Sequence, residues 1–176
     1  SDYIHPLGED HLITVGMDAA PDADPEWGNT WRVAVSLFDV SDLTDPVLAD
    51  REVLDSRNSE AQTEHHAFTW FDEQDALAIP IQTMSGDWAL QVLNIDTETG
   101  VDLVGQVRQG QLTEGMVAPE GDLGECTRIR RPIMMEDKVW AMGAGGLTAA
   151  SLDQPEVELA AVAFTGIGDC WPEEGE

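Results

Sequence analysis

Apolar and polar residues alternate along short stretches of this chain, and each clear stretch begins directly after a turn that contains aspartate. The turn residues lie 65 and then 62 positions apart in the sequence, and they are Asp10, Asp75 and Asp137. The apolar stretches that follow them are 12–15, 77–79 and 139–142. Alternation with a period of two is typical of a β-strand with one buried face. The pattern therefore predicts three units that share an Asp turn followed by a strand.

Two further strands follow the first one in every unit. The second strands are predicted at 35–41, 90–96 and 147–153, and the third strands at 46–54, 101–107 and 157–164. Short connections rich in Asp, Thr, Gly and Pro separate the second strand from the third, as tight hairpin turns require. A strand before the Asp turn, clearest at 66–71 and 127–134, brings each unit to four strands. No segment shows a sustained helical period.

A four-stranded antiparallel unit of about sixty residues that recurs along a chain is typical of a β-propeller blade. The sequence predicts an all-β chain of about three such blades, at residues 1–56, 57–124 and 125–170, with an acidic tail at 171–176. Three blades do not close a ring, so the end blades would expose apolar faces unless further blades or another chain covered them. We therefore expect part of a larger ring. A β-sandwich of the same strands is the alternative architecture.

The chain is strongly acidic: 35 Asp and Glu against 8 Lys and Arg give a formal net charge of -27 over 176 residues. Phosphate binding requires clustered Lys and Arg, so nucleic acid is not expected as a partner. A solvated surface suited to salty water accounts for the charge, and an acidic face that recruits cations or a basic partner is the alternative. No apolar run approaches the roughly 18 residues of a membrane helix, so no membrane span is expected.

The two cysteines, Cys126 and Cys170, do not have the spacing of a zinc site. We expect them to form a disulfide, and two unpaired thiols in a cytosolic protein are the alternative. The disulfide and the acidic surface together predict an extracytoplasmic location, in which the protein is secreted, periplasmic or on the cell surface. The chain begins abruptly at Ser1, without Met, so we expect that a signal peptide or a longer segment precedes it and that it is a fragment.

Several segments resemble, in the same order, those of the secreted bacterial and archaeal β-propeller domain family, which is distantly related to WD-repeat propellers. They are 1–16 (SDYIHPLGEDHLITVG), 36–42 with Asp45 and Pro46, 59–61 with 65–68, 78–81 and 126–131. The resemblance covers residues 1–164 and is to the later part of the domain, which implies that several blades precede Ser1. It implies no particular reaction. The Cys-Trp-Pro-Glu-Glu tail from Cys170 departs from the family pattern.

An acidic segment lengthens the connection between two strands of the first unit. Its carboxylates are closely spaced and supply the hard oxygen ligands that calcium prefers, and the candidate ligands are Asp18, Asp22, Asp24 and Glu26. The segment lacks the glycine and the terminal glutamate of an EF-hand loop. Calcium binding is one hypothesis, and a solvated acidic loop without an ion is the other.

His65 and His66 follow Glu64, and these residue types ligate transition metals. Adjacent residues on a strand point to opposite faces of the sheet, so the sequence predicts that the two histidines do not serve one site. A histidine packed within a blade is the alternative. His5 and His11, on either side of the first turn, are expected to brace that loop.

No arrangement of Ser, His and Asp typical of a hydrolase is evident, and in so acidic a chain a pair of carboxylates is uninformative. The leading hypothesis is a non-catalytic extracytoplasmic propeller scaffold or binding module. Its expected partners are the remaining blades, another protein chain, or a glycan or peptide that stacks on an exposed tryptophan such as Trp27 or Trp88. The alternatives are part of a hydrolase or lyase whose active site lies in blades outside this chain, and a calcium-stabilised component of a surface assembly.

Overall fold

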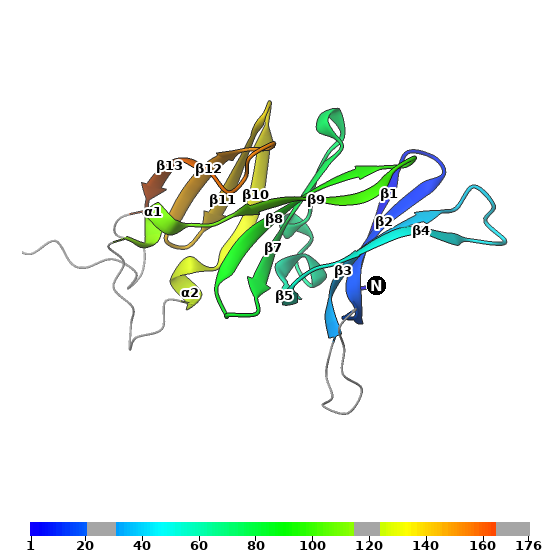
Figure 1. The fold of residues 1–176 in the computed structure, drawn as a ribbon, viewed down its shortest axis with the longest axis horizontal. Coiled ribbons are helices and arrows are strands. Elements are labelled where there is room, and N and C mark those ends of the chain that lie inside the picture. The colour runs from blue at the N-terminus through cyan, green and yellow to red at the C-terminus, as the bar shows by residue number, and fades with distance from the viewer. Residues whose placement is uncertain (21–30, 115–123, 165–176) are drawn as a thin grey trace, which may run out of the picture.

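A computed structural model of the chain describes residues 1–20, 31–114 and 124–164. Antiparallel strands dominate it and form three separate sheets (Figure 1). The first sheet contains β1 (Tyr3–Leu7), β2 (His11–Ala19), β3 (Trp31–Asp39) and β4 (Val47–Val53). The second contains β5 (Ser56–Ser59), β6 (Thr69–Phe71), β7 (Ala76–Thr83), β8 (Trp88–Asp96) and β9 (Gly100–Val107). The third contains β10 (Ile129–Met135), β11 (Lys138–Gly143), β12 (Gly146–Ser151) and β13 (Glu158–Ala163).

Each sheet follows the chain in simple up-and-down order. In the second sheet β5 and β6 share one edge position, because both pair with β7 at different heights. Helical turns are short, and they are η1 (Glu60–Gln62), η2 (His65–Ala67), η3 (Asp72–Gln74), α1 (Gly110–Thr113) and α2 (Gly124–Thr127). Within the described residues, none of the helices is long and apolar enough to cross a membrane. The all-β prediction with three four-stranded blade units is confirmed.

The predicted Asp turns precede β2, β7 and β11. Two of these turns contain a residue in the left-handed backbone region, Asp75 with φ 48° and Glu136 with φ 56°, and the first turn uses Gly8 with φ 62°. A left-handed residue reverses the chain within a few residues, and Gly or Asp adopts it at little cost. This local requirement explains why the turns were recognisable in the sequence.

The second sheet is buried on both faces, and its neighbours are the other two sheets. Leu77, Ile79 and Ile81 of β7 are fully buried in one apolar cluster with Ile13 and Val15 of the first sheet. Ala78, between them, belongs to a second cluster with residues of the third sheet such as Val139 and Ala141. Successive side chains on a strand point to opposite faces, so a nearly continuous apolar run is what a two-sided sheet requires.

The predicted strand at 66–71 is wrong in its first half. Residues 65–67 form the 3₁₀ turn η2, and only Thr69–Phe71 form a strand. The Glu64 side chain accepts a hydrogen bond of 3.1 Å from the backbone N–H of His66, and the Ala67 N–H donates to the Glu64 carbonyl at 3.0 Å. Such local bonds compete with strand pairing. The predicted strand at 127–134 likewise begins only at Ile129, because Thr127 ends α2.

Candidate functional site

The first strands of the three sheets lie along one edge of the molecule, which we call the first-strand edge. It consists of β1 from the first sheet, of β5, η1, η2 and β6 from the second, and of β10 from the third. The Phe68 ring lies 4.6 Å from the Tyr3 ring and 5.1 Å from the His5 ring, measured between centroids. The Thr69 hydroxyl donates to the Pro132 carbonyl of β10 at 3.2 Å. Partial burial in this contact lowers the pKa of His5. The three sheets therefore meet here.

A pocket of about 860 Å³ opens on the first-strand edge. Its walls carry the side-chain amides of Asn58 and Gln62 and the indole of Trp88, and Asp2 lines one side. The Gln62 amide donates to the Asp2 carboxylate at 2.7 Å, which ties η1 to the start of the chain. A hollow with a few converging polar groups and an aromatic ring is the usual composition of a binding site for a small polar ligand.

An ion pair with a buried carboxylate lines the pocket. The Glu60 side chain is only 7% exposed, and the Arg128 guanidinium donates directly to its carboxylate. Arg130 approaches the same carboxylate at 3.9 Å. The Arg128 guanidinium also lies 5.2 Å from the centroid of the Trp88 ring, in a cation–π contact. A carboxylate removed from water requires such partners, so Glu60 and Arg128 depend on each other.

Glu60 is positioned by a local capping motif. The Ser59 hydroxyl accepts the Ala61 N–H at 3.2 Å while the Gln62 side chain accepts the Ser59 N–H at 3.0 Å, which together form a capping box around η1. The Ser59 hydroxyl also donates to the Pro80 carbonyl of β7 at 2.7 Å. Sequence reasoning missed this site, although a serine three residues before a glutamine was a signal for the cap.

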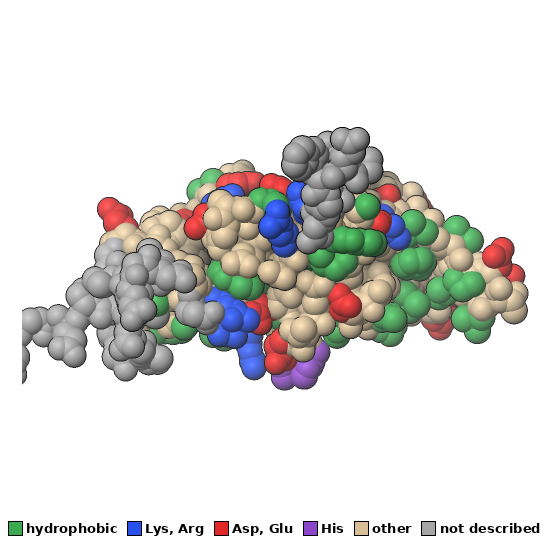
Figure 2. All heavy atoms as spheres, turned by 90° about the horizontal axis from the view of Figure 1, so that it is seen from below, with side chains coloured by type: hydrophobic (Ala, Val, Ile, Leu, Met, Phe, Trp, Pro, Cys, Tyr) green, Lys and Arg blue, Asp and Glu red, His purple; other side chains and the backbone are tan. Residues whose placement is uncertain are grey.

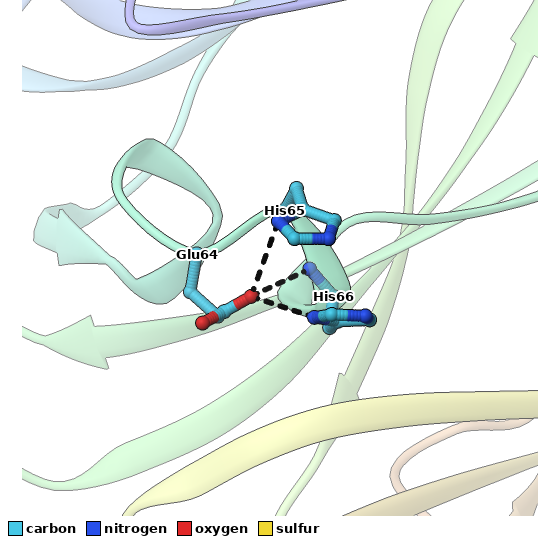
Figure 3. Close-up of side chains that lie close together, drawn as sticks. All are labelled: Glu64, His65 and His66. Carbon is cyan, nitrogen blue, oxygen red and sulfur yellow. Dashed lines mark hydrogen bonds and ion pairs between the residues drawn. The ribbon is translucent and has the colours of Figure 1, made fainter.

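Glu64, His65 and His66 form a second polar cluster on the same edge (Figure 3). One carboxylate oxygen of Glu64 lies 3.4 Å from the His65 Nδ1 and 2.8 Å from the His66 Nδ1. The two rings lie 3.8 Å apart between centroids. The prediction that the two histidines point away from each other is wrong, because they lie on a 3₁₀ turn and not on a strand.

Hydrogen bonds from His66 favour the ionised form of the Glu64 carboxyl. The backbone N–H of His66, and then its ring, hold the pKa of the Glu64 carboxyl below its usual value. In a view of one face of the molecule, histidine side chains project beside acidic ones, and Lys or Arg side chains gather nearby on the same face (Figure 2). The first-strand edge thus combines both charges in an otherwise acidic chain.

The predicted calcium ligands are only partly described. Asp18 lies in β2, where it accepts the Ala19 N–H at 2.7 Å and forms an ion pair with Arg51 of β4. The Ala19 N–H and then Arg51 lower the pKa of Asp18. The other three candidates, Asp22, Asp24 and Glu26, lie outside the described residues. The calcium hypothesis stays a prediction, and Asp18 has an arginine partner.

Cys126 lies in α2 and is 3% exposed. Its predicted partner, Cys170, lies outside the described residues, so the disulfide stays a prediction. The acidic tail at 171–176 also lies outside them, as does Trp27, which was predicted to stack on a glycan or peptide. Trp88, the other tryptophan expected to stack on a ligand, lines the pocket.

Comparison with known proteins agrees with this architecture. Residues 1–154 match the family described as Beta propeller domain. An uncharacterized protein of Methanocaldococcus jannaschii is 30% identical over 80 residues, and an uncharacterized protein of Archaeoglobus fulgidus is 35% identical over 80 residues. In both cases the match covers 46% of this chain and 11% of the relative.

The chain thus matches about a tenth of the length of these curated relatives. No solved structure matches it. The family match covers most of the chain, and the three blade-like sheets have the architecture that the family name describes. The chain belongs to the β-propeller domain family.

Proposed function

We propose that this chain is a non-catalytic scaffold and binding module that docks further blades of a larger propeller through its two outer sheet faces. One observation carries the proposal. Trp140 and Met142 are the third and fifth residues after the turn aspartate of the third sheet, and Ile13 and Val15 hold the same places in the first sheet. Ile13 and Val15 are fully buried against the second sheet, whereas Trp140 and Met142 remain partly exposed.

The face that carries Trp140 and Met142 has a group of apolar side chains, with the exposed Arg131 opposite Met142. Ile133 pairs with Trp140 across neighbouring strands. Leu147 pairs with both Met142 and Val162. Paired residues on neighbouring strands point to the same side of a sheet, so all five side chains share one face. Ile133 is 43% exposed and Val162 is 55% exposed. An apolar sheet face of this kind stabilises a protein when a second sheet covers it.

The register favours the opposite face of another blade as the occupant. In the described interface, Ile13 and Val15 pack into the cluster that contains Leu77 and Ile79, the second and fourth residues after Asp75. A blade with apolar residues at those two places fits Trp140 and Met142. The first sheet presents a related surface, with Leu12 at the second place and exposed Ile4 beside it, so further blades can extend the array on both sides.

We expect the chain to associate with its flanking blades or with itself in solution, and Trp140→Asp with Met142→Asp to abolish that association. A charge on each side chain is tolerated while the face is open to water but is costly once another sheet covers it. Light scattering or analytical ultracentrifugation, with and without the flanking region, measures the mass. Leu103→Asp is the matched control, because Leu103 is 50% exposed on β9. A stable 19.1 kDa monomer that binds no flanking blade contradicts the proposal.

We propose in addition that the pocket on the first-strand edge binds a glycan. Trp88 lines the pocket as an aromatic ring that already has the Arg128 guanidinium on one side. Asn58, Gln62 and Asp2 surround it with donors and acceptors, and sugar hydroxyls would compete with the bond between Gln62 and Asp2. Trp88→Ala is expected to reduce retention on a responsive glycan array by about tenfold or more, because one aromatic contact contributes about 1.4 kcal/mol or more to such binding. Trp31→Ala is the control, since Trp31 is 55% exposed at the start of β3. Equal loss in both variants, or no glycan bound by the parent chain, contradicts this proposal.

The extracytoplasmic location remains part of the proposal, and its support is the predicted disulfide and the acidic composition. A propeller enzyme with its active site in other blades, and a calcium-stabilised surface component, are the alternatives. A substrate panel with the full-length protein tests the first, and calcium titration tests the second.

A further inference from the structure

Three groups that ligate transition metals lie together on one exposed turn. Glu64, His65 and His66 each offer one ligand atom, and these atoms all lie within 4.8 Å of one another. Their side chains are 47%, 70% and 51% exposed, respectively, so an ion from solution reaches them directly. Within the described ranges this is the one set of three or more such residues with that geometry.

The separations resemble those around a bound ion. For metal–ligand bonds of 2.0–2.1 Å, two ligand atoms at tetrahedral or octahedral angles lie about 2.9 to 3.4 Å apart. The Glu64 carboxylate oxygen lies 2.8 Å from the His66 Nδ1 and 3.4 Å from the His65 Nδ1. The 2.8 Å separation is at present a hydrogen bond between the His66 ring and Glu64, so an ion that binds here replaces the shared proton. Small rotations of the two exposed histidine rings then direct their nitrogen lone pairs at the ion.

The turn holds its backbone in place without the ion. Ala67 is fully buried and Phe68 is 8% exposed, and Phe68 packs on the Tyr3 ring of the first sheet. The Phe68 N–H donates to the His65 carbonyl at 3.3 Å, and the Ala67 N–H donates to the Glu64 carbonyl at 3.0 Å. Little backbone ordering remains to be done on binding, and a preorganised site binds more tightly for that reason.

We propose that Glu64, His65 and His66 bind a divalent transition metal ion of the zinc, nickel and copper class. Two imidazole nitrogens and one carboxylate oxygen suit these ions, whereas calcium and magnesium prefer oxygen ligands alone. Three protein ligands leave at least one coordination position for water or an exchangeable ligand. The net charge of -27 attracts cations to the surface, but it does not select among them.

The chain contains four histidines, so imidazole NMR resolves the site directly. After dialysis against a chelator, Zn²⁺ is titrated in a buffer with excess Ca²⁺, which occupies purely acidic sites. We expect one binding event per chain in calorimetry. We also expect the ring signals of His65 and His66 to shift with it, while those of His5 and His11 stay in place. Shifts at His5 or His11 instead, or heat without any histidine shift, overturn the proposal.

Single variants separate ligation from folding. His65→Gln, His66→Gln and Glu64→Gln are each expected to weaken Zn²⁺ binding by about tenfold or more, since each removes one ligand. His11→Gln is the matched control, because it removes a histidine that starts β2 and is not in the cluster. The urea midpoint of every variant is measured without metal, and only variants with the parent midpoint are compared. Zn²⁺ affinity unchanged in His65→Gln and His66→Gln overturns the proposal.

Discussion

Leu77→Ala is expected to lower the free energy of unfolding by about 3 kcal/mol, within the range of about 2 to 5 kcal/mol for a buried leucine. Leu77 is fully buried, with 0% of its surface exposed, and it packs between the first and second sheets. Removal of its branched side chain costs transfer free energy and leaves a void that close-packed strands do not fill. Urea unfolding, followed by tryptophan fluorescence and circular dichroism, measures the change.

Leu103→Ala is the control for this prediction. Leu103 is 50% exposed on β9, and truncation of an exposed side chain changes stability by no more than about 0.5 kcal/mol. Similar losses in the two variants would mean that Leu77 is not a core residue in solution. An unchanged midpoint for Leu77→Ala would mean that the first two sheets do not pack on each other.

Arg128→Ala is expected to lower the free energy of unfolding by about 2 to 3 kcal/mol, because it leaves the Glu60 carboxylate buried without its nearest cation. The Glu60 side chain is 7% exposed and the Arg128 side chain 30%, so water compensates only in part. Arg130, at 3.9 Å from the carboxylate, is too distant to replace the direct contact. Thermal and urea unfolding measure the loss.

The double variant Glu60→Gln with Arg128→Ala is the informative comparison. Replacement of both partners removes the unpaired charge, so the double variant is expected to be more stable than Arg128→Ala. The midpoint of Glu60→Gln alone completes the cycle. Additive losses from the two sites would show that Glu60 and Arg128 act independently, contrary to their contact.

The strands and turns were predictable because their signals are local. The left-handed residues Asp75 and Glu136 lie in turns that the sequence located, and the strands β7 and β11 begin directly after Asp75 and Asp137. The family resemblance, noted on sequence segments, is confirmed by the match over residues 1–154. The predicted ends of strands were less accurate. At 66–71, for example, the Glu64 side chain accepts the backbone N–H of His66, which then does not pair with a neighbouring strand.

The candidate site was not predictable in the same way. Glu60 and Arg128 are 68 residues apart and meet only because two sheets share an edge. The reasoning on His65 and His66 failed at a single step, the assignment of a strand where the chain forms a 3₁₀ turn. Successive side chains on a strand point to opposite faces, whereas those on a 3₁₀ turn lie about 120° apart around its axis. The wrong secondary structure therefore led to a wrong prediction about the site.

The sequence by itself determined the repeated unit, the order of its strands and which side chains share each face, because turn chemistry and a period of two depend on neighbouring residues alone. Only the tertiary structure decided which faces are covered. Ile13 and Trp140 hold equivalent places after their turns, yet Ile13 is buried by the second sheet and Trp140 is partly exposed. Burial and site assembly depend on contacts between distant segments, and no local pattern in the chain encodes the neighbour that a face will meet.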